Sequence, residues 1–74
     1  MVNKYLNATN LVCPLPLLKT KLSLSGLKSG EILEVTATDP TSWDDFASYA
    51  KISGNKLLNA VKLEDIFVYT IEKK

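Results

Sequence analysis

The sequence lacks histidine altogether and contains a single cysteine, Cys13, in its 74 residues. A lone cysteine cannot form a disulfide within the chain, which excludes the disulfide-stapled scaffolds of small secreted proteins. Without histidine, the chain can build neither a Cys-His catalytic dyad nor a Cys/His zinc cluster. Any chemistry at Cys13 therefore proceeds without an imidazole from this chain, and we expect no metal and no other cofactor.

Charge of one sign and long hydrophobic runs are also scarce. The formal net charge is only +1, which leaves no broad basic field of the kind that draws a protein onto nucleic acid. The apolar stretches are far shorter than a membrane span, and the first residues lack the pattern of a secretory signal. We therefore expect a cytoplasmic protein that binds no nucleic acid directly and enters no membrane.

The residues that are present fit one compact domain over residues 1–74. An apolar content of 46% with 23% charged residues is typical of a globular chain and argues against disorder. The sequence shows no internal repeat, no low-complexity tract and no linker. A chain of this length can bury one small core.

Hydrophobic patterning predicts six elements in the order β-α-β-α-β-β. Strands are expected at residues 4–8, 32–38, 56–62 and 66–72, the first helix from near Cys13 to Ser25, and the second between residues 39–42 and Gly54. Right-handed crossovers after the first two strands would place both helices on one face of a four-stranded mixed sheet. The expected fold is therefore α+β, a two-layer α/β sandwich whose last two strands are antiparallel neighbours.

Residue spacing also predicts the faces that build the core. The inner face of the second strand is expected to consist of Leu33, Val35 and Ala37. The inner face of the first helix is expected to be a leucine stripe at helical spacing: Leu15, Leu18 and Leu22, flanked by Leu11 and Leu17. The inner face of the second helix is expected to carry Trp43, Phe46, Ala47 and Ala50. Gly26 is expected to end the first helix with a left-handed cap.

Cys13 is the candidate reactive residue, because it is predicted at the N-cap or first position of the first helix. There the free N–H groups and the positive end of the helix dipole favour a thiolate over a thiol. Pro14 and Pro16 suit the first helical turn, and their fixed torsions are expected to aim the sulfur outward. The alternative is a buried cysteine that acts as a small hydrophobe, with Val12 and Leu15 turning the sulfur inward.

Charged residues near the two helices have competing interpretations. Lys19 and Lys21, together with Lys28, form either a basic rim that docks an acidic partner or a solvated helix face. A cluster of carboxylates surrounds the predicted start of the second helix: Asp39, Asp44 and Asp45. Capping and compensation of the helix dipole are the preferred roles of these aspartates, ahead of acid/base chemistry or binding of a cation.

Residues 6–19 resemble the TusA-like (SirA/YedF-type) sulfur-carrier family, with a Cys-Pro-x-Pro motif at residues 13–16 followed by Leu18-Lys19. Residues 30–35, residues 37–40, Asp45 and residues 54–57 are also similar to family positions, so the resemblance covers nearly the whole chain. Family members form the two-layer sandwich predicted above. Three positions depart from the common pattern: Asn7, where aspartate is frequent; Asn10, where glycine is frequent; and Val12, where a polar residue is frequent. Asn10 can keep the left-handed turn that glycine would adopt.

The resemblance implies a covalent sulfur carrier in which Cys13 accepts sulfane sulfur as a persulfide, with Pro14 and Pro16 shaping its loop. It implies two protein partners, a donor such as a cysteine desulfurase and an acceptor, so the chain would be a sulfurtransferase component that works with partner enzymes. The relay would serve tRNA thiolation, cofactor maturation or sulfur metabolism. Two other hypotheses stay open: a non-catalytic interaction or regulatory module of the same fold, and a thiol-redox protein that forms intermolecular disulfides.

Overall fold

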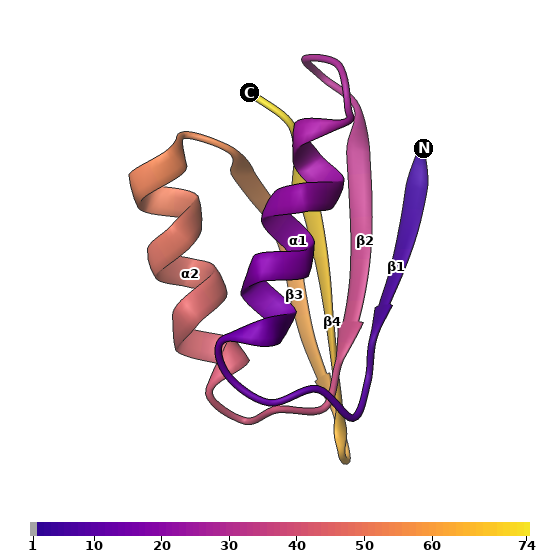
Figure 1. Cartoon of the computed structure of the whole chain (residues 1–74), viewed down its shortest axis with the longest axis vertical. Helices are drawn as coiled ribbons and strands as arrows, with labels where there is room; N and C mark the ends of the chain where they lie inside the picture. Colours follow the sequence, from indigo (N-terminus) through magenta and orange to yellow (C-terminus); the bar gives the residue numbers. More distant parts are fainter. Residues whose placement is uncertain (1) are drawn as a thin grey trace.

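The computed structural model describes residues 2–74 as two layers, a four-stranded sheet with two helices on one of its faces (Figure 1). In chain order the elements are β1 (Lys4–Ala8), α1 (Leu15–Ser25), β2 (Ile32–Ala37), α2 (Ser42–Ser53), β3 (Lys56–Leu63) and β4 (Ile66–Glu72). The predicted element order and the α+β sandwich are confirmed. Within the described residues, neither helix has the length and apolar character needed to cross a membrane.

The sheet has the strand order β1-β2-β4-β3, with β1 and β2 parallel and the other two pairs antiparallel. The last two strands are therefore antiparallel neighbours, as predicted. Ala8 at the end of β1 pairs with Ala37 at the end of β2. Because these parallel strands end together, the loops that follow them leave the same edge of the sheet, at the bottom of Figure 1. The two loops are joined there by the Asn10 N–H, which donates to the Thr38 Oγ1 at 2.9 Å.

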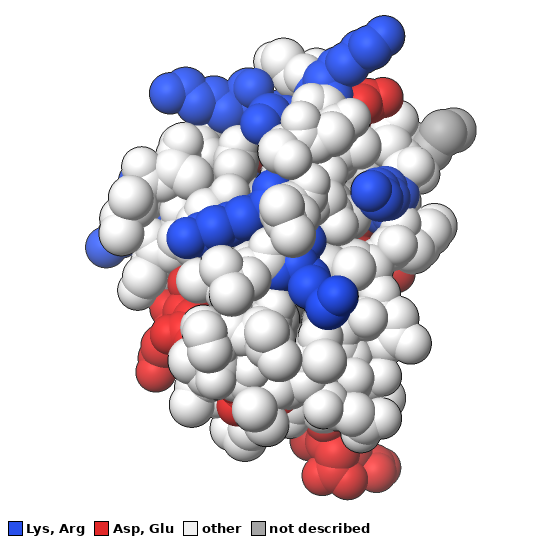
Figure 2. All heavy atoms as spheres, in the orientation of Figure 1, with Lys and Arg blue, Asp and Glu red and all other residues white. Residues whose placement is uncertain are grey.

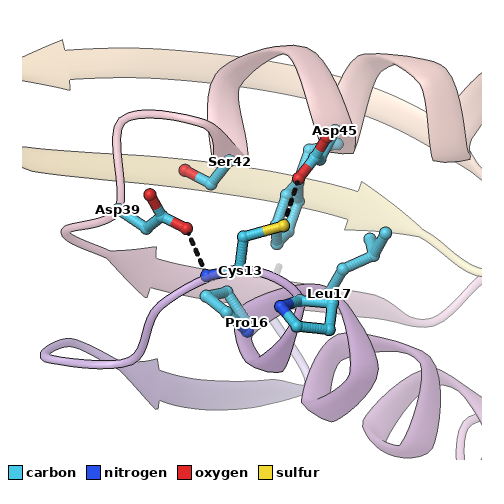
Figure 3. A pocket seen from close by; sticks show the side chains of 8 residues that line it. Cys13, Pro16, Leu17, Asp39, Ser42 and Asp45 are labelled. Carbon is cyan, nitrogen blue, oxygen red and sulfur yellow. Dashed lines mark hydrogen bonds between the residues drawn. The ribbon is translucent and has the colours of Figure 1, made fainter.

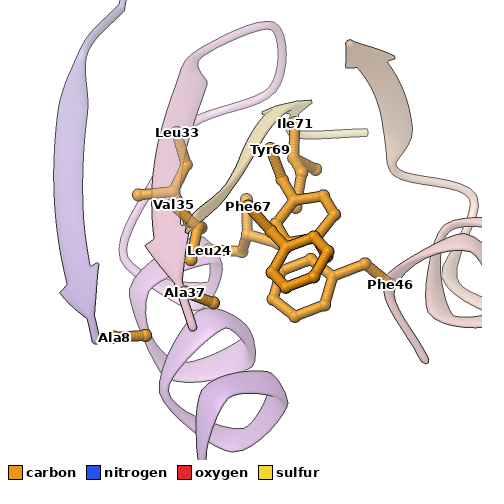
Figure 4. Close-up of a cluster of buried hydrophobic side chains, with 9 residues drawn as sticks. All are labelled: Ala8, Leu24, Leu33, Val35, Ala37, Phe46, Phe67, Tyr69 and Ile71. Carbon is orange, nitrogen blue, oxygen red and sulfur yellow. The ribbon is translucent and has the colours of Figure 1, made fainter. Parts of the chain in front are cut away.

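The core lies between the sheet and the helices and combines aliphatic side chains with the rings of Phe46, Phe67 and Tyr69 (Figure 4). The rings of Phe46 and Tyr69 stack with their centroids 4.2 Å apart. The buried hydroxyls of Tyr69 and Ser42 are hydrogen-bonded to each other at 2.7 Å, which removes the cost of burying either group alone. The predicted inner face of β2 is confirmed, since Leu33, Val35 and Ala37 are all fully buried.

The predicted inner face of α1 is wrong for its three central leucines, although the flanking Leu11 and Leu17 do pack against the core. Leu15, Leu18 and Leu22 are 43%, 47% and 73% exposed. The residues that α1 buries are instead Pro16, Thr20, Ser23 and Leu24. Thr20 can face the sheet because its hydroxyl donates to the Pro16 carbonyl at 2.8 Å. Periodicity missed this face because leucines occupy both sides of the helix and threonine satisfies its own hydrogen bond.

The predicted inner face of α2 is correct for Phe46, which is fully buried, and in part for Ala50, which is half-buried. Trp43 is 41% exposed, and its ring lies against the edge of the core, 6.1 Å from the ring of Phe67. Ala47 is exposed as well. Ser42 takes the inward position because its hydroxyl pairs with that of Tyr69. The fully buried positions of α2 are therefore Ser42 and Phe46, and the apolar pattern identified one of these two.

The left-handed backbone predicted at Asn10 and at Gly26 is found at one of these two positions. Asn10 has φ 64°, as predicted for the turn before Cys13, and Gly54 ends α2 with φ 82°. The prediction for Gly26 is wrong, because its φ of −88° is right-handed. The Gly26 N–H donates to the Ser23 carbonyl at 3.3 Å, so the end of α1 tightens into a short turn without a left-handed residue.

Two leucines of α1 give a matched test of this helix orientation. Leu24 is 1% exposed and Leu22 is 73% exposed. Replacing Leu24 with alanine should lower the free energy of unfolding by about 2–5 kcal/mol, because it leaves a cavity in the core. The same change at Leu22 should cost at most ~0.5 kcal/mol, since leucine and alanine are both good helix formers at an exposed position. Urea unfolding of the two variants measures the difference, and equal losses would contradict the observed orientation.

Candidate functional site

Cys13 lies in the loop between β1 and α1, and not at the start of α1 as predicted. The helix begins at Leu15 with Pro14 at its N-cap, which leaves Cys13 one residue outside the cap. The Leu15 N–H is used in a turn, where it donates to the Val12 carbonyl at 2.9 Å. Cys13 is exposed, so the alternative of a buried structural cysteine is wrong as well.

The backbone of Cys13 is held by the loop that follows β2 (Figure 3). The Cys13 N–H donates to the Asp39 Oδ2 at 2.6 Å. The same oxygen accepts the Thr41 hydroxyl at 2.8 Å, and the Asp39 Oδ1 accepts the Thr41 N–H at 3.1 Å. These bonds, led by that of the Thr41 hydroxyl, lower the pKa of the Asp39 carboxyl from its ordinary value. Asp39 is therefore an anionic clamp that joins the two loops.

The side chain of Cys13 points toward the first turn of α2 (Figure 3). Its thiol donates a hydrogen bond to the Asp45 Oδ2, with 3.5 Å between sulfur and oxygen. This hydrogen bond raises the pKa of the Cys13 thiol, because the bond and the negative charges of Asp45 and Asp39 all disfavour the thiolate. The nearby side chain of Thr41 acts on this pKa in the opposite direction and is the weaker influence.

The predicted electrostatics of Cys13 are therefore wrong in sign. The prediction placed the sulfur at the positive end of α1, where a thiolate would be stabilised. The sulfur lies instead beside two carboxylates, and its resting form is the neutral thiol. This is the opposite of the surroundings found at low-pKa reactive cysteines, which lie next to cations or helix N-termini.

A shallow hollow of about 150 Å³, its open mouth included, surrounds the sulfur. Its lining comes from both loops and both helices: Cys13, Pro14, Pro16, Leu17, Asp39, Ser42, Asp45 and Phe46. The hollow encloses no space for even one water molecule, so any reactant has to be presented to the sulfur from outside. Among the described residues, no group of side chains is arranged to hold a metal ion.

The lysines singled out in the sequence do not line this hollow. Lys19 and Lys21 are exposed on α1. The Lys21 ammonium lies 5.4 Å from the centre of the Tyr49 ring, where it makes a cation–π contact with α2. Figure 2 shows lysines gathered over the middle and top of this face, and carboxylates at the lower left and the bottom. The hydrogen bonds of Cys13 to Asp39 and Asp45 place this residue with the carboxylates.

The carboxylates are the site residues that sequence reasoning missed, since it assigned them to capping. The N-cap of α2 is Thr41, and the helix has no side-chain cap hydrogen bond. One available signal was the first βαβ unit, because the loops that follow two adjacent parallel strands leave the same edge of the sheet. That rule brings Asp39 close to Cys13.

Asn7, one of the departures from the family pattern, closes the turn after β1 by accepting the Thr9 N–H at 3.0 Å.

Comparison with known proteins connects this site to a family. The sequence profile of the family described as Sulfurtransferase TusA matches residues 4–73. The chain is 43% identical over 68 residues to the sulfur carrier protein TusA of Allochromatium vinosum, covering 92% of this chain and 90% of that protein. It is 35% identical over 69 residues to the sulfur carrier protein TusA of Pseudomonas putida, covering 93% and 86% of the two chains.

The fold has a solved counterpart in the crystal structure of a SirA-like protein from Desulfitobacterium hafniense. The two structures agree with a TM-score of 0.81 at 22% sequence identity, over 93% of this chain and 95% of the other. That likeness supports the architecture, whereas the profile and the curated relatives support the role. With the match extending over both loops and both helices of the site, the chain belongs to the TusA family of sulfur carriers.

Proposed function

We propose that this protein accepts a sulfane sulfur on Cys13 as a persulfide and passes it to a second protein. The observation that carries this proposal is the exposure of the chain's single cysteine at a small hollow, in a member of a sulfur-carrier family. Because Cys13 is exposed, one added sulfur atom would extend from it toward solvent. The sulfur donor and the sulfur acceptor are then both groups carried by partner proteins.

The exchange needs no oxidant and no cofactor. In the accepting step the Cys13 sulfur attacks the terminal sulfur of a donor persulfide, a new S–S bond forms at Cys13, and the S–S bond of the donor breaks. The donor cysteine leaves as a thiolate and takes up the proton that Cys13 gives up. In the delivery step the terminal sulfur moves to the acceptor in the same manner, and Cys13 returns to the thiol.

The residues around Cys13 assist this exchange by holding Cys13 in place. Asp39 holds the Cys13 backbone through its N–H and so fixes the direction of the sulfur. Pro14 and Pro16 restrict the torsions of the motif and line the hollow on the α1 side. A pre-organised loop lets two partners meet the same sulfur in the same geometry.

The partner-facing surface would be the exposed side of α1, which begins beside Cys13. Val12 is 68% exposed, and Leu15 and Leu18 are 43% and 47% exposed, which leaves apolar area for a partner to cover. Lys19 and Lys21 lie on the same helix and would attract carboxylates of that partner. The leucine stripe expected in the core is, on this proposal, the docking stripe.

The direct test is the mass of the protein after exposure to a sulfur donor. Incubation with a cysteine desulfurase and cysteine should add the mass of one sulfur atom, and a thiol reductant should remove it. The matched control is Cys13→Ser, which changes one atom at an exposed position and should show no increment. A reduced and accessible Cys13 that gains no sulfur from several different donors would contradict the proposed function.

The docking surface is tested by charge reversal. The double change Lys19→Glu and Lys21→Glu should slow sulfur acceptance from the desulfurase by about tenfold at low salt, because rim charges act mainly on the rate of association. The control is Lys4→Glu with Lys56→Glu, an equal change of net charge at exposed positions on the two edge strands. Equal slowing in both proteins would show that net charge acts and would remove α1 from the docking proposal.

A further inference from the structure

The surroundings of Cys13 oppose the chemistry that a carrier needs. Accepting sulfur requires a thiolate, yet the charges acting on the sulfur are those of Asp45 and Asp39, both negative. Lys19 and Lys21 are not among the groups that line the hollow. The resting protein therefore holds its sulfur in the less reactive form, and a positive charge placed beside the sulfur would relieve this.

The two carboxylates are not equivalent. Asp39 already accepts three hydrogen bonds, from the Cys13 N–H and from both donors of Thr41. Within the described residues, the Asp45 side chain accepts one hydrogen bond, which comes from the Cys13 thiol. Asp45 is also only half-buried, so its carboxylate can be reached from solvent. It is the carboxylate that an incoming group can still engage.

From this geometry we propose that Asp45 is a positioning residue that keeps the Cys13 sulfur protonated until a cationic side chain of the partner pairs with it. The inference rests on the proposed function and names the chemistry of its partner: a lysine or arginine next to the reacting sulfur. Pairing would neutralise Asp45, withdraw its hydrogen bond from the thiol and let the proton leave. Free carrier would then react slowly, and carrier docked to a suitable partner would react quickly.

The charge preference can be measured with small disulfides in place of a partner. Three probes differ in charge: cystamine is cationic, 2-hydroxyethyl disulfide is neutral and dithiodiglycolate is anionic. Each forms a mixed disulfide with Cys13 and releases one thiol, which a mass spectrum follows. Dividing each rate by the rate of the same probe with 2-mercaptoethanol removes differences in intrinsic reactivity.

In the unmodified protein at low salt, the corrected rate with cystamine should exceed that with dithiodiglycolate by about tenfold or more. A unit charge at 4 Å in water contributes about 1 kcal/mol, or roughly fivefold, and the two probes differ in sign. Salt near 1 M should remove most of the preference. Equal corrected rates for the two probes would overturn the proposal.

Two neighbouring aspartates supply the matched variants. Asp45→Asn should reduce the charge preference by about fivefold and raise the rate with the neutral probe near pH 7, because the thiol loses its anionic neighbour. Asp44→Asn removes the same charge one residue away. Because the thiol donates its hydrogen bond to Asp45 and not to Asp44, this change should alter the charge preference by less than about twofold. If the two changes have equal effects, Asp45 acts only through the overall negative charge of the site, and its proposed role beside the sulfur is contradicted.

These measurements use no sulfur donor, so their outcome is separate from the persulfide test. A protein that takes up sulfur but shows no charge preference would refute the role of Asp45 alone. A protein that shows the preference but never takes up sulfur would refute the carrier function alone. If Asp45→Asn does not fold, the unmodified protein with the three probes and salt still decides the question.

Discussion

The hydrogen bond from the Cys13 N–H to the Asp39 carboxylate is the constraint on which the site depends. It joins two loops that lie far apart in the sequence and that meet because β1 and β2 are parallel and end together at Ala8 and Ala37. Asp39 can hold this bond because the donors of Thr41 stabilise its negative charge. The bond holds Cys13 beside the loop before α2, and the thiol reaches Asp45 in the first turn of α2. The surroundings of the sulfur therefore come from both loops and both helices.

In this arrangement, one set of contacts fixes the position of Cys13 and another controls the reactivity of its thiol. The backbone is rigidly tied, whereas the thiol is exposed and faces a carboxylate that opposes its ionisation. An enzyme that acts alone on a small substrate usually activates its nucleophile in advance. A carrier that meets two different proteins gains from the reverse, because a neutral thiol resists alkylation and oxidation between encounters. The proposed sulfur transfer and the proposed role of Asp45 are consistent with this division, in which the partner completes the site.

Sequence patterns predicted the strands, the inner face of β2 and the left-handed turn at Asn10, because each of these depends on neighbours along the chain. They located both helices but failed on most residues of the two inner faces. Leu15, Leu18 and Leu22 follow helical spacing but lie outside, since the hydrogen bond of Thr20 to Pro16 lets a small polar residue face the sheet. Ser42 similarly displaces Trp43 by pairing with Tyr69. Cys13 was identified correctly as an exposed candidate, but the sign of its pKa shift was not, because Asp39 and Asp45 reach it only through tertiary structure.

The central claim is that two carboxylates hold the sulfur of the free protein as a thiol. A pH titration of the Cβ resonance of ¹³C-labelled Cys13 measures this directly, since the chemical shift follows ionisation of the sulfur and the protein has one cysteine. An unstructured peptide of residues 11–15 serves as the reference for an ordinary cysteine, with a pKa of roughly 8.5. The placement of the sulfur beside Asp45 predicts a midpoint above that of the peptide. A midpoint below that of the peptide would show that a thiolate is favoured and would contradict the site as described.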